Sequence, residues 1–251
     1  MTAFKLVIPA RLSSTRLPRK VLRELAGRPL LHWVWEAGCA SGAEEVIVAT
    51  DAEEVLAACR AFGADARLTS ADHRSGTDRV EQVAREAGWR EDSLVVNLQG
   101  DEPLMPPALI RATAQWLAED PQAEIATAAH RIDTRAQWLD PNVVKVVCDA
   151  RGHALYFSRA PIPWPRDGGD AQPPALALRH IGLYAYRVGA LTRLARLPHA
   201  PLEDCELLEQ LRALAHGMAI RVGVTELEVP PGVDTEADLA AVAARLEAHR
   251  R

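Results

Sequence analysis

Apolar and polar positions form a repeating pattern along the first half of the chain. Short strand-like runs lie at Leu6–Ile8, Val46–Ala49, Asp65–Leu68 and Leu94–Leu98. Between them come longer stretches with helical spacing, at Pro29–Cys39, Asp51–Phe62 (with Asp51 as N-cap), Thr77–Ala87 and Pro107–Glu119. Strands that alternate with helices pair in parallel, because each helix carries the chain back across the sheet. The pattern therefore predicts an α/β fold with a mostly parallel central sheet and helices on both faces.

The pattern changes after Ile125. Further strands are expected with no long helix between them, at Ile125–Arg131, Val143–Cys148, Ala154–Ser158 and Ile181–Tyr186. Asp149–Gly152 is a turn between two of them, and Pro161–Pro174 is rich in Pro, Gly and Asp, which is typical of an exposed loop. Helices return at Leu202–His216 and Glu236–His249, around a strand at Ile220–Val224. We predict one α/β domain over residues 1–251, in which residues 125–190 form a mixed-sheet subdomain.

Composition narrows the functional class. The 251 residues are 48% hydrophobic and 25% charged, with a net charge of -5 and 5% aromatic residues. An acidic chain with few aromatic side chains lacks the basic face and stacking platforms that bind nucleic acid. The cysteines are scattered, which excludes a patterned metal cage or disulfide framework: Cys39, Cys59, Cys148 and Cys205. The apolar runs are too short for a signal peptide or a membrane span, so we expect a cytoplasmic protein without membrane insertion.

The N-terminal stretch carries the strongest functional signal. Its first twenty-three residues contain no acidic side chain and these basic ones: Lys5, Arg11, Arg16, Arg19, Lys20 and Arg23. A buried strand there leads into a loop, Pro9–Lys20, in which cations flank Ser13, Ser14 and Thr15. Cations, hydroxyls and unpaired backbone N–H groups are suited to a polyphosphate, although a solvated basic loop would look the same. Neither a P-loop motif nor a G-x-G-x-x-G fingerprint occurs.

Two acidic clusters also lie at expected ends of structural elements. Asp101 and Glu102 follow the strand at Leu94–Leu98, and Asp234 precedes the last predicted helix. One or two carboxylates together with phosphate oxygens suit Mg²⁺. The alternatives are an ordinary turn at Gln99–Pro103 and a helix capping box beginning at Thr235. The two aspartates would make a metal site if they converge in space.

Two further segments could recognise a polar substrate. His180 and Tyr184 share one face of a predicted strand, and Glu206 and Gln210 are four residues apart on a predicted helix. Carboxylate and amide groups there could bind sugar hydroxyls, but a structural histidine and a solvated helix face are the common alternatives. The sequence shows no hydrolase elbow, zinc-protease motif or calcium-binding loop.

Several segments together resemble one family. In chain order they are PARLSSTRLPRK (9–20), ADHRSGTDR (71–79), VNLQGDEP (96–103), NVVKVV (142–147), ALYFSRAPIPW (154–164), RHIGLY (179–184), LEQLR (208–212) and GVDT (232–235). The chain is similar over nearly its whole length to the CMP-Kdo synthetases, the 3-deoxy-manno-octulosonate cytidylyltransferases. The resemblance implies a nucleotide-diphospho-sugar transferase-like fold and the reaction of CTP with 3-deoxy-D-manno-octulosonate (Kdo) to CMP-Kdo and diphosphate, for lipopolysaccharide biosynthesis.

The resemblance also implies roles for individual residues. Asp101 and Asp234 would hold Mg²⁺ and, with Arg11 and Lys20, form the catalytic set. CTP would be bound by Ala10, Arg11, Ser14, Lys20, Ser75 and Gly76. The Kdo pocket would be formed by Arg16, Arg79, Gln99, Arg159, His180, Tyr184, Glu209 and Gln210. The family further suggests a homodimer through the mixed-sheet subdomain.

The chain departs from the family pattern at two positions. Arg19 stands where the family usually has Gly, which is expected to alter the turn before Lys20, and Arg74 stands where Gln is common. The alternatives in function are a cytidylyltransferase for another acid sugar, such as 8-amino-Kdo or sialic acid, and a non-catalytic nucleotide-sugar binding protein.

Overall fold

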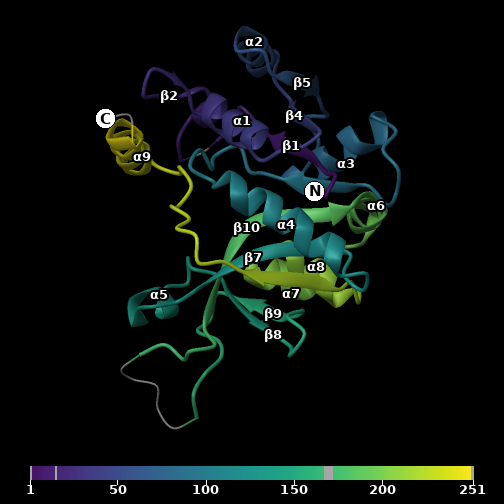
Figure 1. The fold of residues 1–251 in the computed structure, drawn as a ribbon, viewed down its shortest axis with the longest axis vertical. Helices are drawn as coiled ribbons and strands as arrows, with labels where there is room; N and C mark the ends of the chain where they lie inside the picture. Colours follow the sequence, from purple (N-terminus) through teal and green to yellow (C-terminus); the bar gives the residue numbers. More distant parts are fainter. Residues whose placement is uncertain (1, 15, 167–171, 250–251) are drawn as a thin grey trace.

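A mixed β-sheet forms the centre of the computed structural model, which describes residues 2–14, 16–166 and 172–249 (Figure 1). Its main path runs in the order β11-β7-β10-β6-β1-β4-β5. These strands are β1 (Lys5–Pro9), β4 (Glu45–Thr50), β5 (Asp65–Leu68), β6 (Leu94–Asn97), β7 (Ile125–Arg131), β10 (Leu178–Arg187) and β11 (Ile220–Val224). Strands β5, β4, β1 and β6 are parallel neighbours, as are β7 and β11.

Strand β10 is the exception in the central sheet, because it runs antiparallel to both of its neighbours, β6 and β7. It also extends beyond them and pairs with β8 (Lys145–Cys148), which pairs in turn with β9 (Ala154–Ser158). In Figure 1 this hairpin lies at the lower end of the molecule, opposite α2 and β5. The residues predicted as a separate mixed-sheet subdomain thus include two strands, β7 and β10, of the central sheet.

Helices cover both faces of the sheet because its strands are apolar on both sides. In β1, Leu6 and Ile8 face one core, and Val7 faces the other. The first core is covered by α1 (Leu30–Ala40), α2 (Glu53–Ala61), α4 (Pro107–Glu119) and α9 (Glu236–His249). The second is covered by α3 (Gly76–Glu86), α6 (Val188–Arg196) and α8 (Gln210–Ala215).

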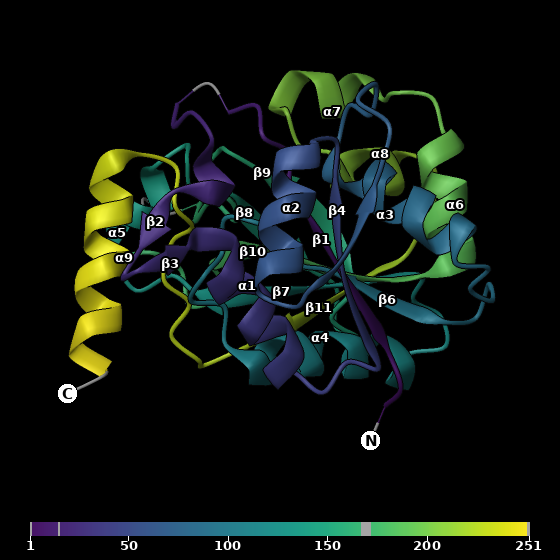
Figure 2. The same ribbon diagram turned by 90° about the horizontal axis from the view of Figure 1, so that it is seen from above.

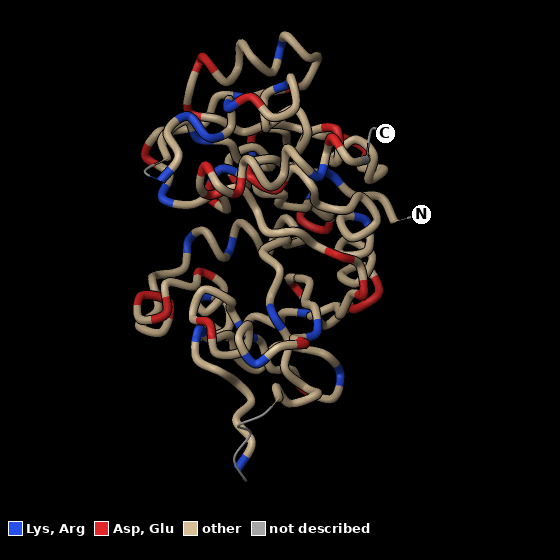
Figure 3. The backbone as a smooth tube through the Cα atoms, turned by 90° about the vertical axis from the view of Figure 1, so that its left-hand side faces the viewer, with Lys and Arg blue, Asp and Glu red and all other residues tan. Residues whose placement is uncertain are grey.

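Small elements connect these layers. The pair β2 (Glu24–Leu25) and β3 (Arg28–Pro29) follows a 3₁₀ turn at Lys20–Leu22 and lies against α9, as Figure 2 shows. Helices α5 (Arg135–Leu139) and α7 (Pro201–Glu206) are short, and sequence periodicity did not separate them from their surroundings. Lys and Arg residues are interspersed with Asp and Glu along the chain (Figure 3). No helix among the described residues combines the length and the apolar character needed to cross a membrane.

Two predictions about elements need correction. The helix predicted over Leu202–His216 is two helices, α7 and α8, because Leu207 takes a left-handed conformation with φ 53° and ψ 49°. Helix α2 begins at Glu53 with Ala52 as its N-cap, so Asp51 does not cap it. Residues 167–171 of the predicted loop Pro161–Pro174 lie outside the described residues.

Candidate active site

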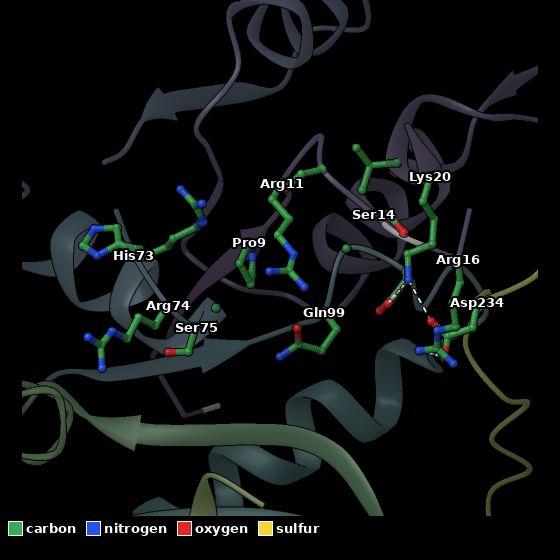
Figure 4. A pocket seen from close by; sticks show the side chains of 16 residues that line it. Pro9, Arg11, Ser14, Arg16, Lys20, His73, Arg74, Ser75, Gln99 and Asp234 are labelled. Carbon is green, nitrogen blue, oxygen red and sulfur yellow. Dashed lines mark hydrogen bonds and ion pairs between the residues drawn. The ribbon is translucent and has the colours of Figure 1, made fainter. Parts of the chain in front are cut away.

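A pocket of about 330 Å³ opens where β1 and β6 end (Figure 4). This edge is where open parallel sheets bind ligands, because the connecting loops diverge there. The pocket is lined by many of the residues predicted to act in binding or catalysis: Arg11, Ser14, Arg16, Lys20, Ser75, Gly76, Arg79, Gln99, Asp101 and Asp234. The structure therefore brings residues from the three sequence clusters to one place. Thr15 lies outside the described residues.

Two local features shape the walls of the pocket. A Cβ atom on Gly100 would lie 2.7 Å from the backbone oxygen of Pro9, so only glycine allows the ends of β1 and β6 to come this close. Ser75 caps α3 by accepting a hydrogen bond from the Asp78 backbone N–H, while Asp78 accepts one from the Ser75 N–H. The capped helix begins at Gly76 on the pocket wall, where its dipole is positive and favours an anion.

Lys20 joins the two distant aspartates. Its Nζ donates to Asp101 Oδ2 over 2.6 Å and to Asp234 Oδ1 over 3.0 Å, and the second oxygen of Asp234 pairs with Arg16 Nη2 at 3.0 Å (Figure 4). Burial of the amine acts against its charged form, but the two carboxylates outweigh this and raise the pKa of Lys20. Asp101 and Asp234 therefore converge in space, and the Lys20 ammonium group lies between their carboxylates.

Asp234 reaches this position although it also precedes a helix. The capping box is formed by the residues after it, since Thr235 Oγ1 accepts from the Asp238 N–H at 3.2 Å and Asp238 Oδ2 accepts from the Thr235 N–H at 2.8 Å. The capping alternative is thus correct for Thr235 and Asp238. It leaves the Asp234 side chain to point into the pocket.

The arrangement fits a divalent cation that shares its coordination with a substrate. Two carboxylates from separate segments already meet at one cationic nitrogen, which is the number of carboxylates that Mg²⁺ commonly takes when phosphates and waters fill its other positions. Within the described part of the chain, no three His, Cys, Asp or Glu side chains gather into a cage that would hold a metal by itself. Glu102 adds little charge, because burial and the neighbouring Asp101 and Asp234 raise its pKa to about 8.

A second, smaller cavity of about 70 Å³ adjoins the first, since Gln99 lines both. Its other lining residues include Tyr184 on β10 and Glu209 and Gln210 at the start of α8, which were all predicted to bind the sugar. Burial raises the pKa of the Glu209 carboxyl, although Thr77 opposes this by hydrogen bonding to it. The Gln210 Nε2 group is buried without a hydrogen-bond partner in the described structure, which leaves a donor available for a ligand.

Comparison with known proteins decides the family. The sequence profile of the cytidylyltransferases matches residues 6–220. The chain belongs to the cytidylyltransferase family. Its structure is similar to the solved structure of CMP:2-keto-3-deoxy-manno-octonic acid synthetase complexed with CTP, with a TM-score of 0.89 and 41% sequence identity. The match covers 98% of this chain and 99% of that chain, and it confirms the predicted fold class.

His180 of this cytidylyltransferase is partly buried and lies next to Tyr184 of the second cavity, with 5.3 Å between the two ring centroids. The Thr127 hydroxyl lies within hydrogen-bond distance of His180 Nε2 (3.0 Å) and of the backbone oxygens of Ile181 and Leu183. The single hydroxyl proton goes to a carbonyl, so His180 donates from Nε2. Burial lowers the pKa of His180 to about 3, and its imidazole is therefore neutral.

Three residues predicted to bind the substrates of the cytidylyltransferase are paired within the protein, buried, or outside both cavities. Arg79 lines the large pocket, but its guanidinium is buried and donates to Asp51 Oδ2 at 2.6 Å, which explains why Asp51 does not cap α2. Ala10 is buried, and its N–H bonds to the Ala49 oxygen. Arg159 lies at the end of β9 and lines neither cavity.

Arg19, at the position where the family usually has glycine, has φ 58° and ψ 29°, the left-handed conformation that glycine adopts at least cost. Its guanidinium pairs with Glu54, away from the two aspartates that Lys20 contacts. With arginine at this position, Lys20 still reaches both carboxylates.

Other pocket residues were not assigned to the site from the sequence. His73 lines the large pocket, together with Arg74, which was noted only as a departure from the family pattern. Thr77 and Tyr186 line the small cavity. For His73 a signal existed, since it lies within the segment ADHRSGTDR that carried the resemblance. Tyr186 gave no such signal, because a strand tyrosine is usually part of the core.

Proposed function

We propose that this cytidylyltransferase is a CMP-Kdo synthetase, which converts CTP and Kdo to CMP-Kdo and diphosphate. The observation that carries the proposal is the junction of a cation-rich pocket with a buried polar cavity at Gln99. It is supported by the similarity over nearly the full length to a structure described as a synthetase of the same sugar nucleotide, solved with CTP. In this assignment the large pocket takes CTP and the small cavity takes part of the sugar acid.

The chemistry needs placement and charge more than a nucleophilic side chain. The anomeric hydroxyl of Kdo attacks the α-phosphorus, a new O–P bond forms, the P–O bond to diphosphate breaks, and the hydroxyl proton is released to solvent. Negative charge then grows on the departing diphosphate, where Arg11 and Lys20 would stabilise it. Holding both reactants in line can contribute on the order of 7–11 kcal/mol toward the barrier.

Mg²⁺ is part of this proposal, with Asp101 and Asp234 as the residues that would hold it. Bound there, the ion would polarise the α-phosphoryl group. The chain's own contribution is to bring two carboxylates to one point and to keep Lys20 beside them as a counter-charge. A triphosphate offers Lys20 new partners, which would leave both carboxylates to the metal.

The test is release of diphosphate from CTP and Kdo, measured with Mg²⁺ and with EDTA in its place. We expect turnover that requires both Kdo and the metal. A panel of 8-amino-Kdo and sialic acid in the same assay separates the acid-sugar alternatives. Binding of CTP without turnover on any acceptor would overturn the proposal in favour of a non-catalytic binding protein.

We also propose that the chain acts as a homodimer through residues 125–190, in the cytoplasm, where CTP is available. Leu155 on β9 supports this, since 62% of its surface is exposed on a strand of this region. Light scattering after size exclusion should give twice the 27.4 kDa mass of one chain. Leu155→Lys should shift the mass toward that of the monomer, and an unchanged dimer would place the interface elsewhere.

A further inference from the structure

Arg159, a residue of the predicted sugar site, is held by the protein through both its backbone and its side chain. Its N–H donates to Glu206 Oε2 at 2.8 Å, its Nε donates to the Glu206 backbone oxygen at 2.7 Å, and its Nη1 donates to the Pro141 oxygen at 3.1 Å. Its own carbonyl accepts from Lys145 Nζ at 2.6 Å. Backbone and side chain of Arg159 are thus fixed from two sides, by Glu206 and by Lys145.

The burial of Lys145 is energetically unfavourable. Its side chain is fully buried, and its Nζ donates to the backbone oxygens of Asp140, Val143 and Arg159. No carboxylate lies within ion-pair distance of it in the described part of the chain, and burial lowers the pKa of its amine. A buried cation without a paired charge costs several kcal/mol, whereas an apolar side chain of similar length would avoid that cost. A buried, unpaired cation that is present despite this cost indicates a functional role.

Glu206 links Arg159 to the second cavity. Besides Arg159, its carboxylate accepts from Ser158 Oγ at 2.6 Å, so it holds the end of β9. It is the last residue of α7, and the left-handed Leu207 that follows turns the chain so that Glu209 and Gln210 line the cavity. The prediction that Glu206 and Gln210 share a helix face is wrong because of this break. Glu206 faces the hairpin, and Gln210 faces the cavity.

We propose that Lys145 and Glu206 are positioning residues for the sugar acid, which hold Arg159 and the Glu209–Gln210 turn in one fixed arrangement. This inference rests on the proposed function. Neither residue lines the nucleotide pocket or the small cavity, so both would act indirectly. Glu206 precedes the turn whose residues Glu209 and Gln210 line the small cavity, so the effect is expected on the acceptor and not on CTP. Lys145 and Glu206 both bond to the backbone of Arg159, and their effects are therefore coupled.

The experiment measures KM for Kdo and for CTP in Glu206→Gln, in Lys145→Met and in the two combined. Glutamine keeps the size of Glu206 but loses its charge-assisted bonds, so we expect KM for Kdo to rise about tenfold or more. KM for CTP should stay within about twofold. In the Lys145→Met background, Glu206→Gln should raise KM for Kdo by less than it does alone, because both residues hold the backbone of Arg159.

Asp204→Asn is the matched control. Asp204 is an exposed carboxylate of the same helix, α7, and its ion pair is with His199. We expect this variant to leave both KM values unchanged. If Lys145→Met does not fold, Glu206→Gln alone still decides the matter.

The outcomes separate the two claims. No turnover of CTP and Kdo by the wild-type enzyme would refute the proposed function and the positioning role together. Turnover by the wild type with an unchanged KM for Kdo in Glu206→Gln, an equal rise in both KM values, or full additivity with Lys145→Met would refute the positioning role alone.

Discussion

The two cavities that share Gln99 are adjacent but differ in the chemistry of their walls. The large pocket is lined by charged side chains from loops at the sheet edge, and several of them are paired only with one another, as Lys20 is with Asp101 and Asp234. The polar lining of the small cavity comes from α3, β6, β10 and α8, and consists of buried or partly buried, mostly uncharged side chains. A charged pocket suits a triphosphate whose binding is mainly electrostatic. A buried neutral cavity suits selection among hydroxyl patterns, because an unmatched polar group there carries its full desolvation cost.

The largest effect is expected from the carboxylates of the charged pocket. Asp101→Asn and Asp234→Asn should each lower kcat for CMP-Kdo formation by about 1000-fold or more, roughly 4 kcal/mol. Each substitution removes one of the two carboxylates proposed to hold the metal. Far-ultraviolet circular dichroism should show an intact fold. Near-normal turnover in either purified variant would remove the metal assignment.

A substitution in the small cavity should change both KM for Kdo and the free energy of unfolding of the protein. Gln210→Leu removes a donor that has no partner in the protein, so we expect the free energy of unfolding to rise by about 1 kcal/mol. The same change should raise KM for Kdo about tenfold and leave KM for CTP unaltered. Gln115→Leu, on the exposed side of α4, is the control and should change neither KM. A loss of stability in Gln210→Leu would show that its amide is satisfied within the fold.

Acid should lower the stability of the folded protein through His180, which lies next to the small cavity. Its pKa is about 3 in the folded chain and 6.5 when exposed, so the unfolded chain takes up a proton below pH 6.5 that the folded chain does not. The stability contribution is complete above pH 6.5 and is lost as the pH falls, by about 2 kcal/mol at pH 5. Urea unfolding of His180→Gln at pH 5 and 7.5 should show a smaller difference than wild type. The exposed His199→Gln should retain the wild-type difference, and an equal difference in both variants would contradict the assignment.

The smallest effect concerns backbone strain in the charged loop. Arg19→Gly relieves a left-handed conformation worth about 1 kcal/mol but loses an exposed ion pair with Glu54, so stability should rise by no more than about 1 kcal/mol. Leu207→Gly relieves the same strain at an exposed side chain without that loss, and thermal unfolding should show the greater gain there. A lower melting temperature for both variants would contradict the strain argument.

Much of the charged pocket could be predicted from the sequence, and little of the buried cavity could. Arg11, Ser14 and Lys20 follow a buried strand in one continuous loop, and Asp101 follows another strand, so local order placed them at the same sheet edge. Glu209 was predicted only through a family resemblance, and Gln210 was predicted on a helix face shared with Glu206. Their direction depends on Leu207, whose left-handed conformation no helical periodicity reveals.

The sequence by itself determined the alternation of strands and helices, and with it the mostly parallel sheet and the edge at which a ligand binds. These follow from the period of apolar positions, which is a local property. Only the tertiary structure decided that Asp101 and Asp234 meet at Lys20, that Arg79 turns to Asp51, and that Glu206 holds Arg159. Each of these contacts joins residues far apart in the chain, and packing of separate elements sets the distance between such residues, so no local pattern encodes it.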